Sequence, residues 1–342
     1  MDRGAEAGPR SRRNWLGWGL ALFILVGCAI FLDLGEVIAI VAGVHPAALV
    51  GILALMTVDR VLMAWKWTLL LRVVGVNLPL STIVRYYYQG TLSGTFMPSM
   101  LGGDLLRAHW VAQASGVTHP VFAALLMERM IGFLSAINWG ILGAVIFACI
   151  VYEQRLWTWV ALGGAGSLLL ILTFFLSLHA TVHGTVLAGL RFFGQSRVLG
   201  LLHRLYEAYS RFGSAQLVVA QNIALTIGEQ LLQMTIFLLV ARSLEIDVGV
   251  ALFLALAAIH ILINRIPISP DGWGVMELTA IGLFGLIGIG PEAAFSLTFL
   301  SHVLNTVVVL PGFWFLLQRH RHPFATTTNG ECDRRSTGRP SA

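Results

Sequence analysis

A short polar stretch in an otherwise apolar chain carries residue types that bind anions. Residues 96–110 read FMPSMLGGDLLRAHW, in which a proline and two glycines precede an aspartate and an arginine. A proline ends a helix because it lacks an N–H donor and clashes with the preceding turn. A new helix starting near Asp104 would present free N–H groups and a positive dipole end, which suit phosphate. Gly102 and Gly103 are expected to allow a sharp reversal of the chain at this break. Arg107 is the expected contact to the anion. The residues of this break are Pro98, Gly102, Gly103, Asp104 and Arg107.

A second stretch of the same kind lies in the other half of the chain. Residues 265–277 read RIPISPDGWGVME, so prolines and glycines again stand between charged residues. An alignment of the chain with itself that places Pro98 on Pro267 also places Gly103 on Gly272. The breakers and candidate ligand contacts of this stretch are Arg265, Pro267, Pro270, Gly272, Gly274 and Glu277.

Further charged side chains fall within apolar runs, where each costs at least about 2.5–3.5 kcal/mol unless it faces the protein interior or a cavity. Glu128 and Arg129 begin one such run, and we predict that they contribute to ligand binding. Asp59, Arg60 and Lys66 lie in another run. For these three, ion pairs that only hold helices together are the favoured interpretation.

The composition excludes a soluble domain. The chain has 342 residues, of which 57% are hydrophobic and 11% charged, and its mean hydropathy is +0.79. A soluble domain carries about 25% charged residues. The net charge of +5 comes from arginines gathered near the chain ends and in one loop. This is the pattern of basic cytoplasmic loops in membrane proteins, so no nucleic-acid partner is expected.

We therefore expect an all-α polytopic membrane protein, because apolar runs of about 20 residues form membrane-spanning helices. The stretches 82–117 and 248–290 are predicted to be re-entrant hairpins, since a broken helix survives in lipid only inside protein or beside a water-filled cavity. For 248–290, two tilted full spans, giving eight in all, preserve the topology equally well. The loop 35–46 lacks Arg and Lys and should face outward. Full spans are predicted at 15–34, 47–72, 121–151, 156–178, 216–241 and 293–317.

The polar segments set the expected orientation. Residues 1–14 and the tail 319–342 are rich in arginine, which places both termini in the cytoplasm, and the tail should be disordered. The segment 185–213 spaces four arginines among apolar residues. It reads either as an amphipathic helix on the cytoplasmic membrane surface or as a plain connecting helix with solvated charges.

The alignment of the two broken stretches also suggests an internal repeat. It places the span 47–72 on 216–241, and these two spans should run in opposite directions through the membrane. We predict a membrane domain, 15–318, built of two inverted repeats, 47–151 and 216–318. In transporters of this kind, interrupted segments in corresponding positions mark a binding site at the repeat interface.

Four segments, AWKWTLLLRVVG, FMPSMLGGDLLRAHW, ERMIGFLS and RIPISPDGWGVMEL, together resemble the flippase-like family. This family is the membrane region of lysylphosphatidylglycerol synthases, and stand-alone bacterial and archaeal proteins share it. The resemblance covers about 15–318. Family members often carry Arg directly before the glutamate of the second motif, where this chain has Met276, so Arg265 becomes a candidate substitute. The matched residues are Pro98, Gly102, Gly103, Arg107, Glu128 and Arg129 in the first motif, and Pro267, Gly272, Gly274 and Glu277 in the second.

The resemblance implies translocation of a lipid or lipid-linked amphiphile, whose anionic headgroup binds between the repeats. It does not imply lysyl transfer, because no soluble aminoacyl-transfer domain follows the last span. No GxxxxGK[ST] motif is present, so we expect neither nucleotide use nor another cofactor, and no metal. The expected location is the cytoplasmic membrane of a bacterium or archaeon.

Two other functions stay open. An integral-membrane transferase acting on a lipid phosphate would need a base beside the acceptor and usually a cluster of acidic residues, whereas the carboxylates here are scattered. A non-catalytic partner of a lipid-biosynthetic enzyme would use small-residue faces such as GGAG at 163–166, which serve internal packing equally well. Product formation by the purified protein separates the transferase from a translocator.

Overall fold

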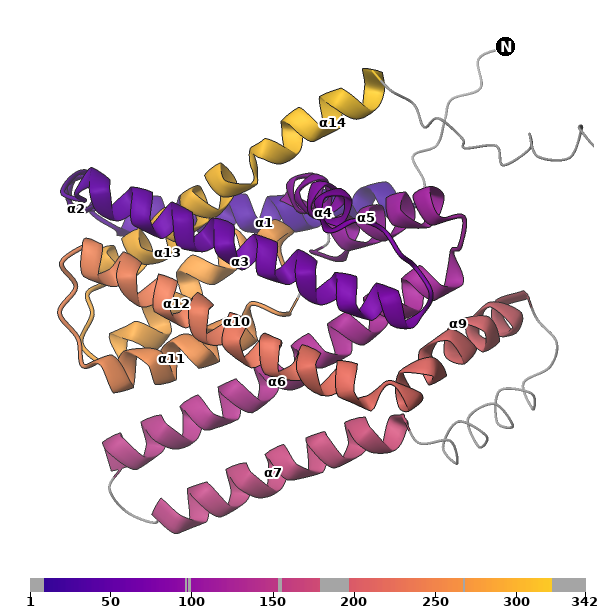
Figure 1. Ribbon diagram of the computed structural model, residues 1–342. Coiled ribbons are helices and arrows are strands. Elements are labelled where there is room, and N and C mark those ends of the chain that lie inside the picture. Colours follow the sequence, from indigo (N-terminus) through magenta and orange to yellow (C-terminus); the bar gives the residue numbers. More distant parts are fainter. Residues whose placement is uncertain are drawn as a thin grey trace, which may run out of the picture.

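The computed structural model describes residues 9–95, 97, 100–152, 156–178, 197–266 and 268–321. Within this part of the chain every regular element is a helix and there is no strand, which confirms the all-α fold. Figure 1 shows the helices packed into one bundle, with α3, α6 and α10 as its longest members.

Five helices of the described chain are long and apolar enough to cross a membrane, which confirms a multi-pass membrane protein. They agree with five of the predicted spans to within a few residues. In the last of them α14 continues α13, and the two together qualify as one span. The five are α3 (Pro46–Val73), α6 (His119–Tyr152), α7 (Leu156–Ser177), α10 (Gln216–Ser243), and α13 (Pro291–Val309) with α14 (Pro311–Arg321).

The first predicted span is a bent pair of helices, α1 (Pro9–Phe31) and α2 (Leu34–Ala42), which meet at 94°. The carboxylate of Asp33 accepts hydrogen bonds from the backbone N–H groups two and three residues on, at 2.8 and 3.3 Å. This cap starts a new helix at once. The expectation of a loop at 35–46 is therefore wrong over most of its length.

Two pairs of short helices occupy the interrupted stretches. The helices α4 (Leu80–Thr95) and α5 (Met100–Ser115) have 16 residues each, while α11 (Val250–Ile263) and α12 (Val275–Gly285) have 14 and 11. At 1.5 Å per residue none exceeds about 24 Å, against about 30 Å for the hydrocarbon core. Figure 1 shows α4 almost end-on, so it lies across the direction of α3. These lengths suit re-entrant hairpins, and re-entry itself stays a prediction.

The glycines of the first break serve packing and not a reversal of the chain. The helix α5 begins four residues before Asp104, so the expected helix start at Asp104 is wrong and both glycines lie inside the helix. Neither Gly102 nor Gly103 has a positive φ. A Cβ on Gly103 would meet the carbonyl oxygen of Gly90 and lie 2.9 Å from the Cα of Gly94. The absence of side chains here lets α4 and α5 touch backbone to backbone.

The helices α3 and α10 end in the same way, at corresponding places in the two halves. Each is followed by a residue in the left-handed region, Gly75 (φ 87°) and Glu245 (φ 58°). In both cases the next N–H donates to the carbonyl five residues back, at 2.9 and 3.0 Å. The helix α4 then follows α3 as α11 follows α10. The first half of the chain (47–151) and the second half (216–318) thus share their order of elements through this region.

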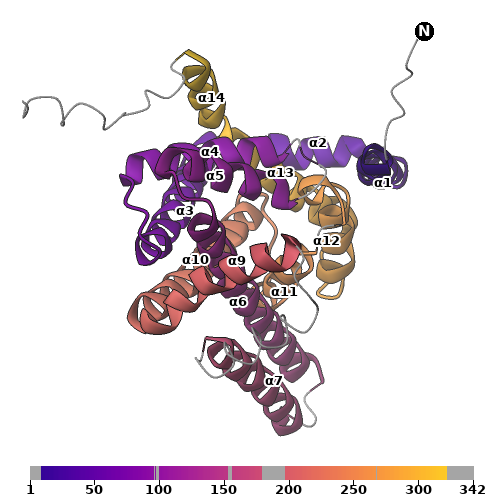
Figure 2. The ribbon, with the colours of Figure 1, turned by 90° about the vertical axis from the view of Figure 1, so that its right-hand side faces the viewer.

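The two equivalent helices pack side by side and antiparallel. Asn222, near the start of α10, donates through Nδ2 to the carbonyl oxygen of Lys66, late in α3 (2.8 Å). At the opposite ends, Ile52 of α3 and Val240 of α10 belong to one buried apolar cluster. Figure 2 shows the two helices adjacent on one side of the bundle. Opposite directions of equivalent helices are what an inverted repeat requires.

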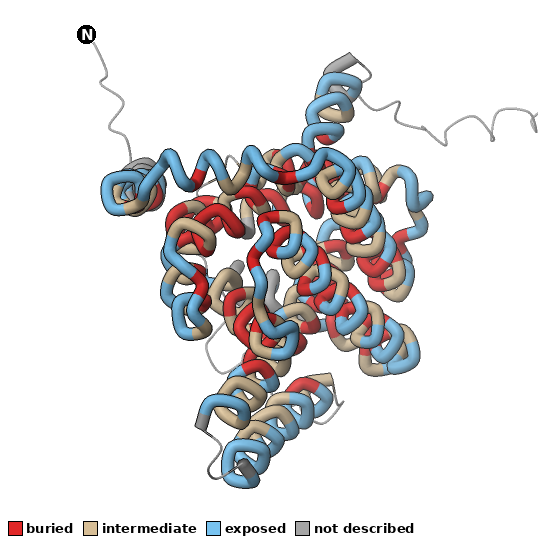
Figure 3. The backbone as a smooth tube through the Cα atoms, turned by 90° about the vertical axis from the view of Figure 1, so that its left-hand side faces the viewer, coloured by how far each residue is buried: buried red, intermediate tan, exposed pale blue. Residues whose placement is uncertain are grey.

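The elements at the edge of the bundle are α7 and α9 (Arg197–Ser214). Figure 2 shows α7 projecting away from the other helices, and Figure 3 shows buried residues concentrated in the centre of the bundle. The side chains of Tyr209 and Phe212 on α9 are buried, and the Tyr209 hydroxyl lies 3.1 Å from that of Ser177. This favours a connecting helix for the described part of 185–213; residues 185–196 lie outside the described residues.

The close approach of α4 to α5 can be tested with two glycine variants. We expect Gly103→Ala to destabilise the protein by about 1–3 kcal/mol, because the added methyl must push the helices apart. Gly51→Ala on α3 is the matched control, since a Cβ there meets nothing within 4 Å. Thermal unfolding of both purified variants in one detergent measures the difference. A Gly103→Ala melting temperature at or above that of the control would contradict the packing role.

Candidate functional site

Arg107 of α5 lies between two aromatic rings inside the first half. Its guanidinium carbon is 4.3 Å from the ring centroid of Trp67 on α3 and 4.3 Å from that of Tyr87 on α4. The residue is 1% exposed. A guanidinium held over aromatic faces is attracted to them more strongly when it is removed from water. One side chain therefore joins α3, α4 and α5.

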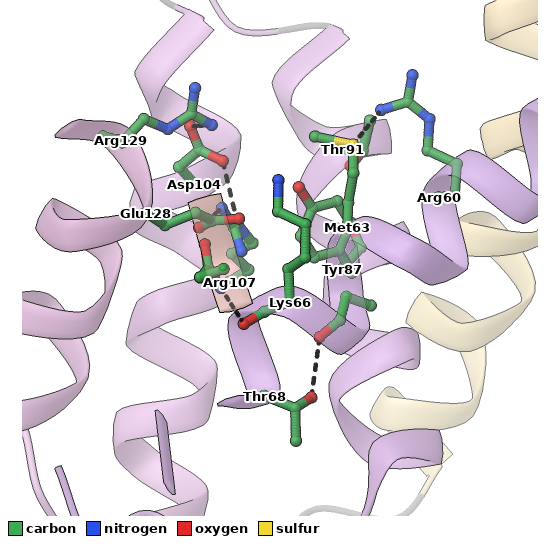
Figure 4. Close-up of polar contacts among 12 residues, drawn as sticks. Arg60, Met63, Lys66, Thr68, Tyr87, Thr91, Asp104, Arg107, Glu128 and Arg129 are labelled. Atoms are coloured by element: carbon green, nitrogen blue, oxygen red, sulfur yellow. Dashed lines mark hydrogen bonds and ion pairs between the residues drawn. The ribbon is translucent and has the colours of Figure 1, made fainter. Parts of the chain in front are cut away.

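Carboxylates on two helices neutralise this buried guanidinium. Arg107 donates through Nε to Oδ1 of Asp104 (3.0 Å) and through Nη2 to Oε2 of Glu128 on α6 (2.6 Å). The other oxygen of Asp104 forms an ion pair with Arg129. Figure 4 shows Asp104 between the two arginines. The structure thus brings together the four charged residues that the sequence assigned to the first half of the site.

A small cavity lies beside this network, where the two halves meet. Glu128 and Arg129 line it from the first half, and Glu229 and Arg265 line it from the second. Its volume is about 30 Å³. The cavity is therefore small and is lined by charged side chains from both halves.

Arg265 is the cation of this cavity that has no counterion among the described residues. Lys66 forms an ion pair with Glu229, and Arg129 is paired with Asp104. No carboxylate in the described part of the chain lies within 4.0 Å of the Arg265 guanidinium. Its side chain is half-buried. A planar guanidinium with free donors beside a cavity suits a phosphate or carboxylate.

The second break is built around Glu277, near the start of α12. One carboxylate oxygen accepts the N–H of Gly274 (2.7 Å) and so caps the helix, and the other lies 2.8 Å from Nδ1 of His302 on α13. Gly272 and Gly274 both have φ of 81°, so the glycine reversal expected from the sequence occurs at this break. Glu277 is 0% exposed. Both its oxygens are engaged inside the protein, and its contact with a ligand stays a prediction.

His302 is fixed from three sides. Its Nε2 lies 3.1 Å from the backbone oxygen of Asp271, which only accepts, so Nε2 carries a hydrogen. Its ring stacks on Trp273 with 4.3 Å between centroids. Since Nδ1 faces a carboxylate oxygen of Glu277, a further proton lies between the imidazole and that carboxylate. This hydrogen-bonded pair ties α13 to the break between α11 and α12.

Arg107 and Glu277 have opposite charges and similar places in the two halves. The alignment that places Pro98 on Pro267 puts Arg107 on Met276, one residue before Glu277, whereas the alignment that places Gly75 on Glu245 puts Arg107 on Glu277 itself. Each lies on the short helix after a break and bonds to the next long helix, Arg107 to Glu128 and Glu277 to His302. The second half has methionine, at position 276, where the family resemblance leads one to expect an arginine. The two halves thus use one scaffold with exchanged charges.

The predicted site residues fall into two groups. Pro98 and Pro267 lie outside the described residues, and Pro270 begins the 3₁₀ turn η1 (Pro270–Gly272) that follows α11. In the first group, Glu128, Arg129 and Arg265 line the cavity, Asp104 and Arg107 are ion-paired with Arg129 and Glu128, and Gly102 and Gly103 lie at the contact of α5 with the chain around α4. The group around the second break comprises Pro270, Gly272, Gly274 and Glu277.

The aromatic residues around Arg107 were missed by sequence reasoning. Tyr87, in the run RYYYQG at 85–90, is buried in the bundle, and Trp67 is fully buried. Both residues lie in separate apolar stretches, and only the packing of three helices brings them to one guanidinium. The one signal in the sequence for aromatic rings around Arg107 is an arginine in an apolar stretch with few acidic residues to neutralise it.

These features define a polytopic, all-helical membrane protein with paired helix breaks and charged residues gathered inside the bundle. Residues 18–312 match the family described as the lysylphosphatidylglycerol synthase TM region, so the chain belongs to this family. It is 20% identical to a UPF0104 membrane protein of Methanothermobacter thermautotrophicus, with 83% of this chain and 88% of the relative covered. It is also 20% identical to a UPF0104 membrane protein of Methanocaldococcus jannaschii, with 84% and 88% covered. The family resemblance found in the motifs is confirmed.

The Arg107 network predicts a coupled stability effect. Arg107→Met should lower the free energy of unfolding by about 3–5 kcal/mol, because it leaves buried carboxylates without a cation. Adding Glu128→Gln should recover part of this loss, since one unpaired charge is removed. Denaturant unfolding of the wild type, both single variants and the double variant in detergent measures the coupling. Strictly additive losses would contradict the paired arrangement.

The two bonds of Glu277 can be separated by substitution. Glu277→Gln keeps an oxygen that accepts the Gly274 N–H, whereas Glu277→Ala removes the cap and the His302 contact together. We expect the alanine variant to be less stable than the glutamine variant by about 1–3 kcal/mol. Thermal melts of the two variants under one set of conditions measure this. Equal melting temperatures would mean that the cap contributes nothing.

Proposed function

We propose that this protein moves a lipid or lipid-linked amphiphile with an anionic headgroup across the membrane. The observation that supports this most is the cavity at the junction of the two halves, beside which Arg265 has no counterion among the described residues. Phosphate oxygens would bind a guanidinium that already lies in a polar, shielded place. The family to which the chain belongs is named for a lipid-modifying system, which supports a lipid-related role.

We further propose that 47–151 and 216–318 are inverted repeats within a membrane domain, 15–318. The matching ends of α3 and α10 and their antiparallel packing support this. In inverted-repeat transporters the substrate site lies at the repeat interface, and one repeat rocks against the other to open it to each side in turn. The cavity of about 30 Å³ would then be the closed state of that site.

In this proposal the headgroup contacts Arg265 and Arg129, while the acyl chains remain in the bilayer. Two of the three guanidinium nitrogens of Arg107 are held by Asp104 and Glu128, so we assign Arg107 the role of positioning Asp104, which in turn holds Arg129. Direct contact between Arg107 and the anion stays a prediction that requires this network to open. The protein performs no covalent chemistry, and both termini lie in the cytoplasm.

Lipid exchange in reconstituted vesicles tests the function. Wild-type protein should accelerate the appearance of fluorescent phosphatidylglycerol in the outer leaflet, measured by dithionite bleaching. Arg265→Ala should slow this by about tenfold or more, because a charge-assisted hydrogen bond contributes about 1.5–3 kcal/mol and 1.4 kcal/mol is a factor of ten. Arg265→Lys should retain part of the rate. The matched control is Arg72→Ala, which removes an exposed arginine at the end of α3.

Each result has a distinct meaning. Wild-type rates with Arg265→Ala would exclude Arg265 from the site, and a loss shared by Arg72→Ala would point to non-specific damage. Failure of the wild type to move any probe would reject translocation. A covalently modified lipid, detected by mass spectrometry of the same vesicles, would favour a transferase.

A further inference from the structure

The carboxylate of Asp59 is a buried charged group that is only partly satisfied. Asp59 lies in the middle of α3 and is 2% exposed. Its Oδ1 is buried and has no hydrogen-bond partner in the structure. An ionised carboxylate withdrawn from water is strongly unfavourable unless hydrogen bonds and countercharges compensate it. This side chain lacks much of that compensation.

The nearest cations are occupied elsewhere. Arg60 approaches Oδ2 of Asp59 only to 3.9 Å, outside hydrogen-bond distance. Its guanidinium donates instead to Oδ1 of Asn305 on α13 (2.9 Å) and to the sulfur of Met63 (3.5 Å). Lys66 is paired with Glu229. Figure 4 shows Arg60 beside Met63, away from the Arg107 network.

The other carboxylate of this region comes from the equivalent position of the second half. The alignment that places Gly75 on Glu245 also places Asp59 on Glu229, in the middle of α10. Because α3 and α10 are antiparallel neighbours and Asn222 lies against Lys66, Asp59 and Glu229 fall at the same level of the two helices, and the charge of Glu229 acts on Asp59. Gln233 donates to Oε1 of Glu229 (3.1 Å) and also faces Asp59. Two carboxylates that share one buried place are stabilised when a proton is held between them.

The surroundings of this pair come from every helix packed against it. From α3 come Arg60 and Lys66, and from α10 come Glu229 and Gln233. The helix α4 contributes the phenol of Tyr88, which faces Arg60, and α13 contributes the uncharged Asn305. The helix α6 contributes Glu128 and Arg129, which line the cavity together with Lys66 and Glu229.

We propose that Asp59, with Glu229 as its exchange partner, is a proton-binding site that couples headgroup movement to a proton gradient. A proton from water binds a carboxylate oxygen of Asp59 or Glu229, and the same oxygen returns it to water when the crossing of α3 and α10 opens to the other side. No covalent bond to the lipid forms or breaks. This inference rests on the proposed function, because it assigns that function an energy source.

The coupling between headgroup binding and proton binding follows from the charges around the cavity. Glu229 lines the cavity together with Arg265, so its negative charge opposes an anion there. A proton on the Asp59–Glu229 pair removes one negative charge beside the headgroup. Anion binding and proton binding therefore favour each other, and by linkage the effect is reciprocal. Headgroup and proton would move in the same direction.

Vesicles loaded with a pH-sensitive dye test this directly. With wild-type protein, an imposed pH gradient should accumulate fluorescent phosphatidylglycerol in one leaflet, and lipid movement should carry protons. Asp59→Asn should lose both the accumulation and the proton flux while keeping exchange without a gradient, because the amide imitates the protonated acid. Asp247→Asn, at an exposed ion pair, is the matched control. Asp59→Glu, which restores an acid, should restore proton flux.

Infrared spectroscopy of the detergent-solubilised protein gives a second readout that needs no transport. The wild type should show a protonated carboxyl band that disappears in Asp59→Asn and persists in Asp247→Asn. Loss of exchange by the wild type would reject the proposed function, and the infrared band would still decide whether Asp59 binds a proton. Accumulation by Asp59→Asn equal to wild type, a band unchanged in that variant, or a requirement for Na⁺ at constant pH would each overturn the proton site.

Discussion

The ion pairs around Arg107 are the interaction on which the closed arrangement of the first half depends. A guanidinium in a bilayer needs both countercharge and shielding from lipid. Asp104 and Glu128 supply the charge, and two aromatic rings supply the shielding. These contacts link α3, α4, α5 and α6 at one point. The short hairpin of α4 and α5, which is too short to cross a membrane, is held against the long helices by this point and by glycine contacts within the hairpin.

The second half also binds its short helix to the next long helix, but through other residues. Its break is stabilised by Glu277, which caps α12 and bonds to His302, where the first half has Arg107 bonded to Glu128. Exchange of the charged partner preserves a bond between the short helix and the next long helix. It also leaves the two halves electrically different, so a headgroup would meet Arg265 from one side and the Arg129 network from the other.

The long helices α3, α6, α7 and α10 followed from the sequence because lipid requires about 20 apolar residues for each span. Features that depend on distant contacts did not follow. The two glycines of the first break predicted a chain reversal. In the structure, Gly103 instead allows close contact with Gly90 on α4, and a local sequence pattern does not reveal such a contact. The helix α2 was missed because one side chain, Asp33, turns a short apolar run into a capped helix. The sequence predicted the charged residues of the candidate site. The aromatic rings around Arg107, and the lack of a counterion for Arg265 among the described residues, could be seen only in the packed structure.

The charge balance beside the cavity is incomplete among the described residues. Charged groups inside a membrane bundle depend on partners within the protein. Arg265 has no carboxylate within 4.0 Å among the described residues, and Oδ1 of Asp59 has no hydrogen-bond partner. These two groups have opposite charges and lie on opposite halves. An anion bound at Arg265 and a proton bound at Asp59 would compensate both side chains at once. The packing of α3 against α10 would let the charges at these two places influence each other.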